Sequence, residues 1–387
     1  MKTERNHIDL SVLISVLILM VLSLGVVYSA SSTWSLEKYG ESGKLLGSHA
    51  IKIIAGFGAI LLFMKIDYKK YKKLTKPALT GAIILLLVTL GLGGEVKGAS
   101  RWLRLGGFGL QPSEFAKYAL VFHLCVLLAE KQKRIADFKT GFVPTMIWVG
   151  CVTVLVLLQP NFSTGAMIFG ISLILLFVGG ARFNHLMLTL ASLLPLLLVY
   201  MVSAPYRMKR IMSFFDGSSS GERSNYQLWQ GIIGFGNGGV FGLGPGESRQ
   251  RDLFLPESYG DFVFSIVGEE YGLIGTLFIM ALFLVITLRG LKIAKHARDD
   301  FGRNLAVGIT LTISLHALVN AAVTLGILPT TGLPMPFVSY GGSSMLFSSV
   351  AIGVLLNISS QTDMYPRLHQ APDGVRPLEP RFAGKPA

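Results

Sequence analysis

The stretch DFVFSIVGEEYGLIGTLFIMALFLVI, residues 261–286, is one of the longest apolar runs in the chain, and it begins with a carboxylate. A bilayer core about 30 Å thick requires roughly 20 apolar residues per spanning helix, and this run is long enough. Of the 387 residues, 51% are hydrophobic and only 15% are charged, whereas a soluble domain has about 25% charged residues. The sequence therefore predicts a polytopic membrane protein.

Ten apolar stretches of this kind occur along the chain, and each predicts one transmembrane helix. They lie near residues 10–30, 46–66, 78–94, 113–130, 142–159, 163–180, 184–203, 262–288, 305–327 and 341–360. The expected fold class is all-α, with about ten transmembrane helices in a single domain over residues 1–361. Residues 362–387 are rich in proline and charge, which predicts a disordered cytoplasmic tail.

Lysine and arginine are unevenly distributed between the loops, and this sets the orientation. One side carries the N-terminus, the tail and the basic clusters near residues 69–76, 131–139 and 289–303. By the positive-inside rule that side is cytoplasmic, so both termini are expected there. The net charge of +13 then reflects topology, and no nucleic-acid partner is expected. Cys125 and Cys151 fall inside predicted helices, which favours packing roles over a disulfide or a metal site.

Residues 204–261 form a large loop on the extracytoplasmic side, and they contain the glycine-rich run GFGNGGVFGLGPGES at 234–248. A phosphate-binding loop requires a Lys followed by Ser or Thr after its glycines, and none follows here. Tight turns and close backbone approach are the better interpretation of these glycines.

Two segments place cations at the outer side of the predicted helices. In QPSEFAK, residues 111–117, Glu114 and Lys117 have the i, i+3 spacing that brings side chains together on a helix, with Gln111 just before them. The pair either locks two helices or presents Lys117 to an anionic substrate with Glu114 orienting it. In KGASRWLRL, residues 97–105, Arg101, Trp102 and Arg104 are either an interfacial anchor or a phosphate-binding element. We favour phosphate binding.

Asp261 stands where the loop ends and the eighth predicted helix begins. Rotation by 100° per residue places Gly268, Gly272 and Gly275 near the face of Asp261, and small residues permit close helix contacts in membranes. Glu270 falls on the opposite face. Asp261 is then either a helix N-cap, a position that favours Asp, or a functional acid above a tight helix contact.

Several motifs, in this order and spacing, resemble the SEDS family of shape, elongation, division and sporulation proteins. They are KGASRWL and QPSEFAK, the glycine-rich run, LPESYGDFVFSIVGEEYGLIG at 255–275 and GLPMPFVSYGGSSM at 332–345. The resemblance covers nearly the whole chain. VGEEYG and PTTGLPMPFVSYGGSS make the cell-division branch the best match, and the elongation branch is the alternative.

This resemblance implies a ten-span glycosyltransferase that polymerises lipid II into peptidoglycan strands, with Asp261 matching the essential acid of the family. It also implies a class B penicillin-binding transpeptidase and other divisome membrane proteins as partners, at the septum in the cytoplasmic (inner) membrane. Two positions depart from the family pattern. Tyr259 and Gly260 stand where His-Thr is common, and Asn161 stands where an Asp is common.

The implied reaction requires a base for the acceptor hydroxyl and cations for the departing pyrophosphate. Asp261 is the candidate base, and Arg101, Arg104 and Lys117 are the candidate cations, with a divalent cation, Mg²⁺ or Mn²⁺, as a further candidate whose ligands the sequence does not identify. With a single carboxylate we expect inversion at the anomeric carbon. Further substrate contacts are predicted in two segments, at Glu257, Ser339, Gly341, Gly342 and Ser343. Packing is the alternative interpretation of these residues.

Two other function classes remain open at this point. A lipid flippase or transporter also has many helices and buried charges, although the polar groups here gather at the outer boundary and no inverted repeat is evident. A scaffold that recruits other cell-wall proteins is compatible with catalysis.

Overall fold

The computed structural model describes residues 7–92, 94–96, 99–105, 108–130, 134–202, 208, 223–251, 255, 258–362 and 364. Each of the ten predicted stretches is a helix. They are α1 (Leu10–Tyr39), α2 (Lys44–Lys65), α3 (Tyr71–Leu92), α4 (Pro112–Glu130), α5 (Val143–Leu158), α6 (Phe162–Val178), α7 (Phe183–Val202), α10 (Val263–Lys295), α11 (Asp300–Thr324) and α12 (Gly342–Ser359). Among the described residues, eight helices are long and apolar enough to cross a membrane, while α6 and the Phe183–Pro195 part of α7 are shorter apolar helices.

Several helices extend beyond the predicted apolar windows. The first continues to Tyr39, where Gly40 ends it in the left-handed conformation with φ 72°, as a glycine at this position commonly does. Likewise, α10 continues to Lys295. Hydropathy marks the part of a helix that lies in lipid, and it does not mark the polar turns that continue into water.

The loops contain regular structure that the sequence did not predict. Helix α9 (Arg223–Gly238) lies in the predicted outer loop, so Gly234, Gly236 and Gly238 of the glycine-rich run are helical, and the expectation of turns is wrong for this part. Before α4, strands β1 (Gly94–Val96), β2 (Ala99–Leu105) and β3 (Phe108–Leu110) pair antiparallel in the order β1-β2-β3. Short one-turn elements also occur at Tyr68–Lys70 and Phe138–Phe142. The described residues therefore depart from a purely all-α fold at the β1-β2-β3 sheet.

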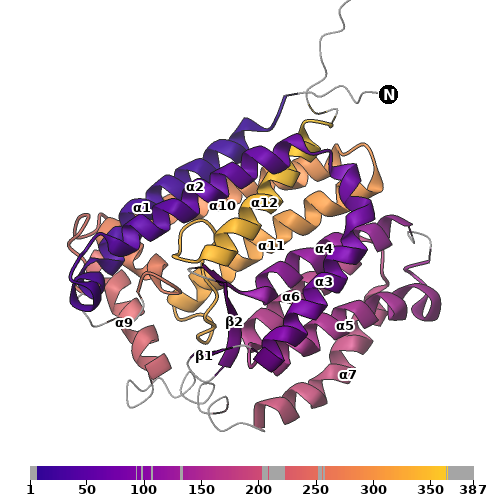
Figure 1. Ribbon diagram of the computed structural model, residues 1–387, viewed down its shortest axis with the longest axis horizontal. Coiled ribbons are helices and arrows are strands. Elements are labelled where there is room, and N and C mark those ends of the chain that lie inside the picture. Colours follow the sequence, from indigo (N-terminus) through magenta and orange to yellow (C-terminus); the bar gives the residue numbers. More distant parts are fainter. Residues whose placement is uncertain are drawn as a thin grey trace, which may run out of the picture.

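Helices α11 and α12 lie at the centre, between α1 and α2 on one side and α3 to α6 on the other (Figure 1). Helices α2 and α12 form a close seam because glycines meet the opposite helix. A Cβ at Gly353 would lie 2.8 Å from the carbonyl oxygen of Ile60, and one at Gly56 would lie 2.8 Å from Oγ of Ser349. Of the two cysteines, Cys125 is buried as expected, whereas Cys151 is exposed, so the packing interpretation is wrong for Cys151.

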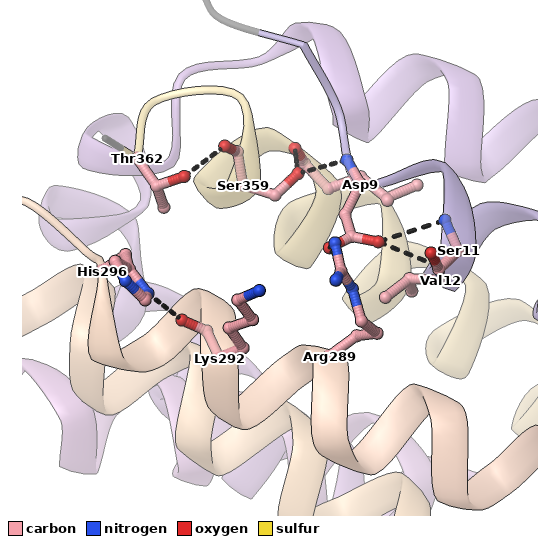
Figure 2. Close-up of polar contacts among 9 residues, drawn as sticks. Asp9, Ser11, Val12, Arg289, Lys292, His296, Ser359 and Thr362 are labelled. Atoms are coloured by element: carbon pink, nitrogen blue, oxygen red, sulfur yellow. Dashed lines mark hydrogen bonds and ion pairs between the residues drawn. The ribbon is translucent and has the colours of Figure 1, made fainter. Parts of the chain in front are cut away.

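The cytoplasmic end of the bundle is held by a buried ion pair (Figure 2). Asp9 caps α1 by accepting hydrogen bonds from the N–H groups of Ser11 and Val12. Its other carboxylate oxygen lies 2.7 Å from a terminal guanidinium nitrogen of Arg289 on α10 and accepts from Nε at 2.8 Å. The N–H of Asp9 donates to Oγ of Ser359 at the end of α12. One residue thus joins three helices.

A second set of contacts closes the same end. The amide of the buried Asn357 on α12 accepts from the N–H of Tyr68 at 2.8 Å and donates to the carbonyl of Met64 at 2.9 Å. The hydroxyl of Tyr68 in turn donates to Asp299 at 2.5 Å, and Asp299 caps α11. These polar groups satisfy the ends of helices, which otherwise leave backbone donors and acceptors unpaired.

Candidate functional site

Asp261 lies in the turn that leads into α10, and it is not the N-cap of that helix. The N-cap position belongs to Phe262, whose side chain makes no capping hydrogen bond. The N-cap interpretation of Asp261 is therefore wrong, because the helix begins one residue later than the apolar pattern suggested.

The backbone around Asp261 is fixed by a buried asparagine of α11. Nδ2 of Asn320 donates to the carbonyl of Asp261 at 2.8 Å and to the carbonyl of Leu333 at 2.7 Å. The Asp261 carboxylate lies against the same 332–333 segment, since a Cβ at Gly332 would be 3.3 Å from its Oδ2. Gly332 has φ 71°, a conformation that favours glycine. Asp261 thus lies against an irregular loop, and the Asn320 side chain is hydrogen-bonded to both segments.

One helical turn before Asn320 on α11, His316 contacts the predicted Glu114–Lys117 ion pair. Nζ of Lys117 lies 2.9 and 3.0 Å from the two carboxylate oxygens of Glu114 and 2.9 Å from Nε2 of His316. All three side chains are buried. The i, i+3 pairing predicted from QPSEFAK is confirmed, and Pro112 occupies the first position of α4 as expected.

Helix α11 connects the acid to the cation, because His316 and Asn320 are four residues apart and share one face. At a rise of 1.5 Å per residue, their Cα atoms are separated by about 6 Å along the helix axis. Polar residues at this spacing on a membrane helix commonly form hydrogen bonds to neighbouring helices. His316 does bond across to α4, whereas Asn320 bonds to loop carbonyls.

Tyr340 forms the next part of the site, at the end of the 325–341 loop. Its ring lies 3.4 Å from Nζ of Lys52 on α2, and its hydroxyl is 3.0 Å from Oγ of Ser48. The N–H of Tyr340 donates to the carbonyl of Tyr259, two residues before Asp261, and the two rings are edge to face. Tyr259, a departure from the family pattern, therefore has a packing partner.

The start of α12 contacts the start of α4 through Ser343. Its hydroxyl accepts from the N–H of Gln111 at 2.9 Å and donates to the carbonyl of Gly109 at 3.3 Å. A Cβ at Gly342 would lie 3.4 Å from Cε of Lys52. Ser339 is buried and accepts from the N–H of Met335, which stabilises its own loop. The structure therefore brings Gln111, Gly342 and Ser343 together and gives Ser339 a local role.

The predicted phosphate-binding element lies on β2. Arg101 donates from Nε to the carbonyl of Gln159 at 3.2 Å and from a terminal nitrogen to the carbonyl of Pro160. Trp102 is half-buried and packs near Gly109. Arg104 pairs with Gly109 through the strand backbone, while its side chain lies outside the described residues, as does Glu257. Asn161 is buried, 3.5 Å from Oγ of Ser113.

The glycine face predicted for α10 is interrupted, because Gly272 has φ 63° and ψ −159° and breaks the helix. Gly268 still makes a close contact, here with Phe235 of α9. The two acids that follow are buried. Glu269 accepts from the N–H of Gln250 at 3.2 Å, and Glu270 accepts from Ser29. Neither acid is brought to the Asp261 turn.

The sequence marks some further members of the site and gives no sign of others. Lys52 was recognisable as a charge within an apolar stretch, and His316 and Asn320 as polar residues one turn apart on a predicted helix. Tyr340 carried no signal of its own, because its partner Ser48 is 292 positions away. Among the described residues no group of three or more His, Cys, Asp or Glu side chains could hold a metal ion. The site therefore combines the Asp261 carboxylate with the buried Lys117–Glu114 pair and the partly exposed Lys52.

The sequence matches a known protein family and several known relatives over most of its length. The profile of the FTSW_RODA_SPOVE family, described as a cell cycle protein, matches residues 9–364. A probable peptidoglycan glycosyltransferase FtsW of Geobacter metallireducens is 39% identical over 360 residues, covering 92% of this chain and 96% of that protein. Stage V sporulation protein E of Bacillus subtilis is 38% identical over 363 residues, covering 93% and 99%.

A solved structure shares the fold. One chain of a peptidoglycan synthase complex, described as coordinating polymerization and crosslinking, superposes with a TM-score of 0.76 at 24% identity, covering 93% of this chain and 99% of that chain. The chain therefore shares the fold of that protein over nearly its whole length.

Proposed function

Because the chain belongs to the FTSW_RODA_SPOVE family of cell cycle proteins, we propose that it is a peptidoglycan glycosyltransferase that polymerises lipid II, with Asp261 as the general base. The observation that carries the proposal is the anchoring of Asp261. A buried amide holds its carbonyl, and its carboxylate rests on the 332–333 backbone. A base must be held in reach of the hydroxyl that it deprotonates.

In the proposed reaction, Asp261 removes the proton of the acceptor sugar hydroxyl. The resulting oxygen attacks the anomeric carbon of the donor and forms the new glycosidic bond. The bond from that carbon to the pyrophosphate oxygen breaks, and the polyprenyl pyrophosphate leaves with the electron pair. Direct displacement inverts the anomeric configuration, and a sugar covalently trapped on Asp261 would contradict this.

Cations near the acid support the departure of the pyrophosphate. Lys52 joins Arg101, Arg104 and Lys117 as a candidate, because its ammonium lies over the Tyr340 ring and beside Gly342. Lys117 is already neutralised by Glu114, so it orients the site and contributes less net charge than Lys52. Preorganised charges aimed at a developing anion are the strongest source of such stabilisation.

We further propose a class B penicillin-binding transpeptidase as partner and the division septum as location, within the cytoplasmic membrane. The identities of 39% to a division protein and 38% to a sporulation protein are nearly equal. The assignment to division therefore rests on the motifs VGEEYG and PTTGLPMPFVSYGGSS, with elongation as the alternative.

The test compares the wild type with Asp261→Asn, purified with and without the transpeptidase and supplied with labelled lipid II. We expect glycan formation to fall at least about 100-fold, a typical effect of losing a general base, while lipid II binding persists. Asp300→Asn, at the cytoplasmic end, is the matched control and should polymerise normally. Glycan formation by Asp261→Asn at the wild-type rate would exclude the base role.

One feature favours a second function, a lipid flippase. Helix α10 is broken at Gly272, and interrupted helices are typical of transporters. Asp261→Asn distinguishes the two functions in reconstituted vesicles, because a flippase would still move lipid II between leaflets when glycan formation is lost.

A further inference from the structure

The break at Gly272 divides α10 into two parts with different surroundings. Residues 263–270 before the break are all buried. Directly after it, Leu273, Ile274, Leu277 and Phe278 are each about half exposed. In a membrane protein, such a row of exposed apolar side chains faces lipid. The lipid-facing surface of α10 therefore begins at the break.

The backbone groups freed by the break are paired with the loop after α9. An unbroken helix would bond the N–H of 273 to the carbonyl of 269, and that of 274 to the carbonyl of 270. Here the N–H groups of Leu273 and Ile274 instead donate to the carbonyls of Gly239 and Val240 at 2.9 and 3.2 Å. The carbonyls of Glu269 and Glu270 accept from the N–H groups of residues 243 and 244 at 2.9 and 3.0 Å. The loop replaces both missing helix bonds.

Close backbone contact at this junction depends on glycine. A Cβ at Gly272 would lie 2.5 Å from both the nitrogen of Gly242 and the carbonyl oxygen of Val240. Gly242 itself has φ 84°. These positions admit the loop backbone where side chains would separate it from α10.

The depth of the break follows from the cytoplasmic end of α10. Between Gly272 and Arg289 the chain has no charged residue. The 17 intervening steps at 1.5 Å each span about 25 Å, less than the hydrocarbon thickness of about 30 Å, and tilt would reduce the depth further. Irregular backbone in the hydrocarbon region is tolerated where its polar groups are satisfied by protein, and the hydrogen bonds described above provide this.

The side chains of the loop are apolar and point outward. Phe241 is 82% exposed, Val240 53% and Leu243 40%. The backbone bonds place Val240 beside Ile274 on the lipid-facing surface of α10. Beyond the loop, Glu247 and Arg249 are also exposed, which marks a return to a polar environment. On α9, exposed Tyr226 and Trp229 are residue types enriched at membrane boundaries.

We propose that residues 239–244 form a re-entrant loop inserted in the outer leaflet, where Val240, Phe241 and Leu243 contact lipid acyl chains. Continuity with the lipid-facing surface of α10 identifies the occupant as lipid. The loop also contacts α9 and the buried part of α10 that follows Asp261. Contact between the loop and lipid therefore helps to hold the start of α10, next to Asp261, in position. This inference does not depend on the proposed reaction.

The test measures the depth of a spin label at position 241 in the full chain reconstituted in lipid vesicles. Cys125 and Cys151 are first replaced by alanine, and Phe241→Cys is then labelled. Leu277→Cys is the lipid-facing control and Arg249→Cys the aqueous control. Collision with oxygen, which concentrates in lipid, is compared with collision with a water-soluble nickel chelate.

We expect the label at 241 to match the label at 277, with oxygen collisions exceeding nickel collisions several-fold. Nickel accessibility equal to that at 249 would overturn the proposal, because the loop would then lie in water. Low accessibility to both reagents would overturn it as well, because protein would cover the loop. Phe241 is almost fully exposed, so its replacement is not expected to impair folding, and a thermal melting curve for each variant checks this.

Discussion

The outer and cytoplasmic ends of the bundle use the same kinds of buried residue for different purposes. At the cytoplasmic end, Arg289 pairs with Asp9 and Asn357 holds the chain at Met64 and Tyr68. At the outer end, Lys117 pairs with Glu114 and Asn320 holds the chain at Asp261 and Leu333. In the part of the chain that the structure describes, each end therefore has an ion pair with a buried carboxylate, together with a bridging asparagine.

The difference lies in the backbone that these side chains hold. The cytoplasmic residues satisfy helix ends, so every contact is explained by folding. The outer residues hold an irregular loop next to a carboxylate, and Oδ1 of Asn320 has no hydrogen-bond partner among the described residues. Residue type and burial alone do not separate a structural cluster from a functional one. The two clusters are distinguished by the segment that each one holds in place, helix ends at one and an irregular loop at the other.

The largest expected effect on stability comes from removing the Lys117 cation, and removing Arg289 is the corresponding change at the cytoplasmic end. Lys117→Met leaves Glu114 charged and buried, and loss of one partner of a buried pair costs about 3–5 kcal/mol. Arg289→Met leaves Asp9 with its two capping N–H groups, and Arg289 is partly exposed, so we expect about 1–2 kcal/mol. Thermal unfolding in detergent measures both. Adding Glu114→Gln to Lys117→Met should restore most of the lost stability, and failure to do so would contradict the ion-pair account.

The paired asparagines separate positioning from stability. Asn320→Ala releases the carbonyl of Asp261, and misplacement of a catalytic group by about 1 Å can cost about 100-fold in rate, so we expect kcat to fall by roughly this factor with little change in KM. Asn357→Ala should lower the free energy of unfolding by about 1–3 kcal/mol and leave kcat unchanged. Steady-state kinetics with lipid II checks the comparison. Equal kcat losses in the two variants would remove the distinction between the ends.

The smallest effect is expected for Tyr340→Phe at the outer end, and Tyr68→Phe is the corresponding change at the cytoplasmic end. Tyr340→Phe loses the contact to Ser48 and retains the ring beneath Lys52, for a cost of about 0.5–1.5 kcal/mol. Tyr68→Phe loses a hydrogen bond to a carboxylate, for about 1.5–3 kcal/mol. Tyr340→Leu also removes the cation–π contact, which adds about 0.5–2 kcal/mol. If Tyr340→Phe and Tyr340→Leu have the same melting temperature and activity, the ring does not position Lys52.

The ten helices were predictable because each has to cross the same apolar thickness, and the Glu114–Lys117 pair because helix geometry fixes neighbours three residues apart. Helix α9 was missed because glycines at 231, 234, 236 and 238 resemble a turn-rich segment, although in the fold those at 231, 234 and 238 admit the neighbouring α10. The break at Gly272 was missed because an apolar run looks the same whether the helix is continuous or interrupted.

Contacts between distant segments account for the rest of the site. Lys52, Tyr340 and Asn320 acquire their roles from loops and helices that lie far away in the sequence. The resemblance to a family identified Asp261 without indicating what holds it. The physical reason is that a polar residue in an apolar helix predicts burial with a partner, and the sequence does not name the partner.

The glycine seam between α2 and α12 has a mechanical consequence. Gly353 meets the backbone of α2 and Gly56 meets the Ser349 side chain of α12, so we expect these two helices to move as one rigid body. Lys52 on α2 and Ser343 on α12 are therefore carried together, and their separation stays constant through a reaction cycle. Rearrangements that admit a bulky polymer or release it must take place where helices meet through larger, compressible side chains. A covalent cross-link across this seam would be tolerated without loss of turnover.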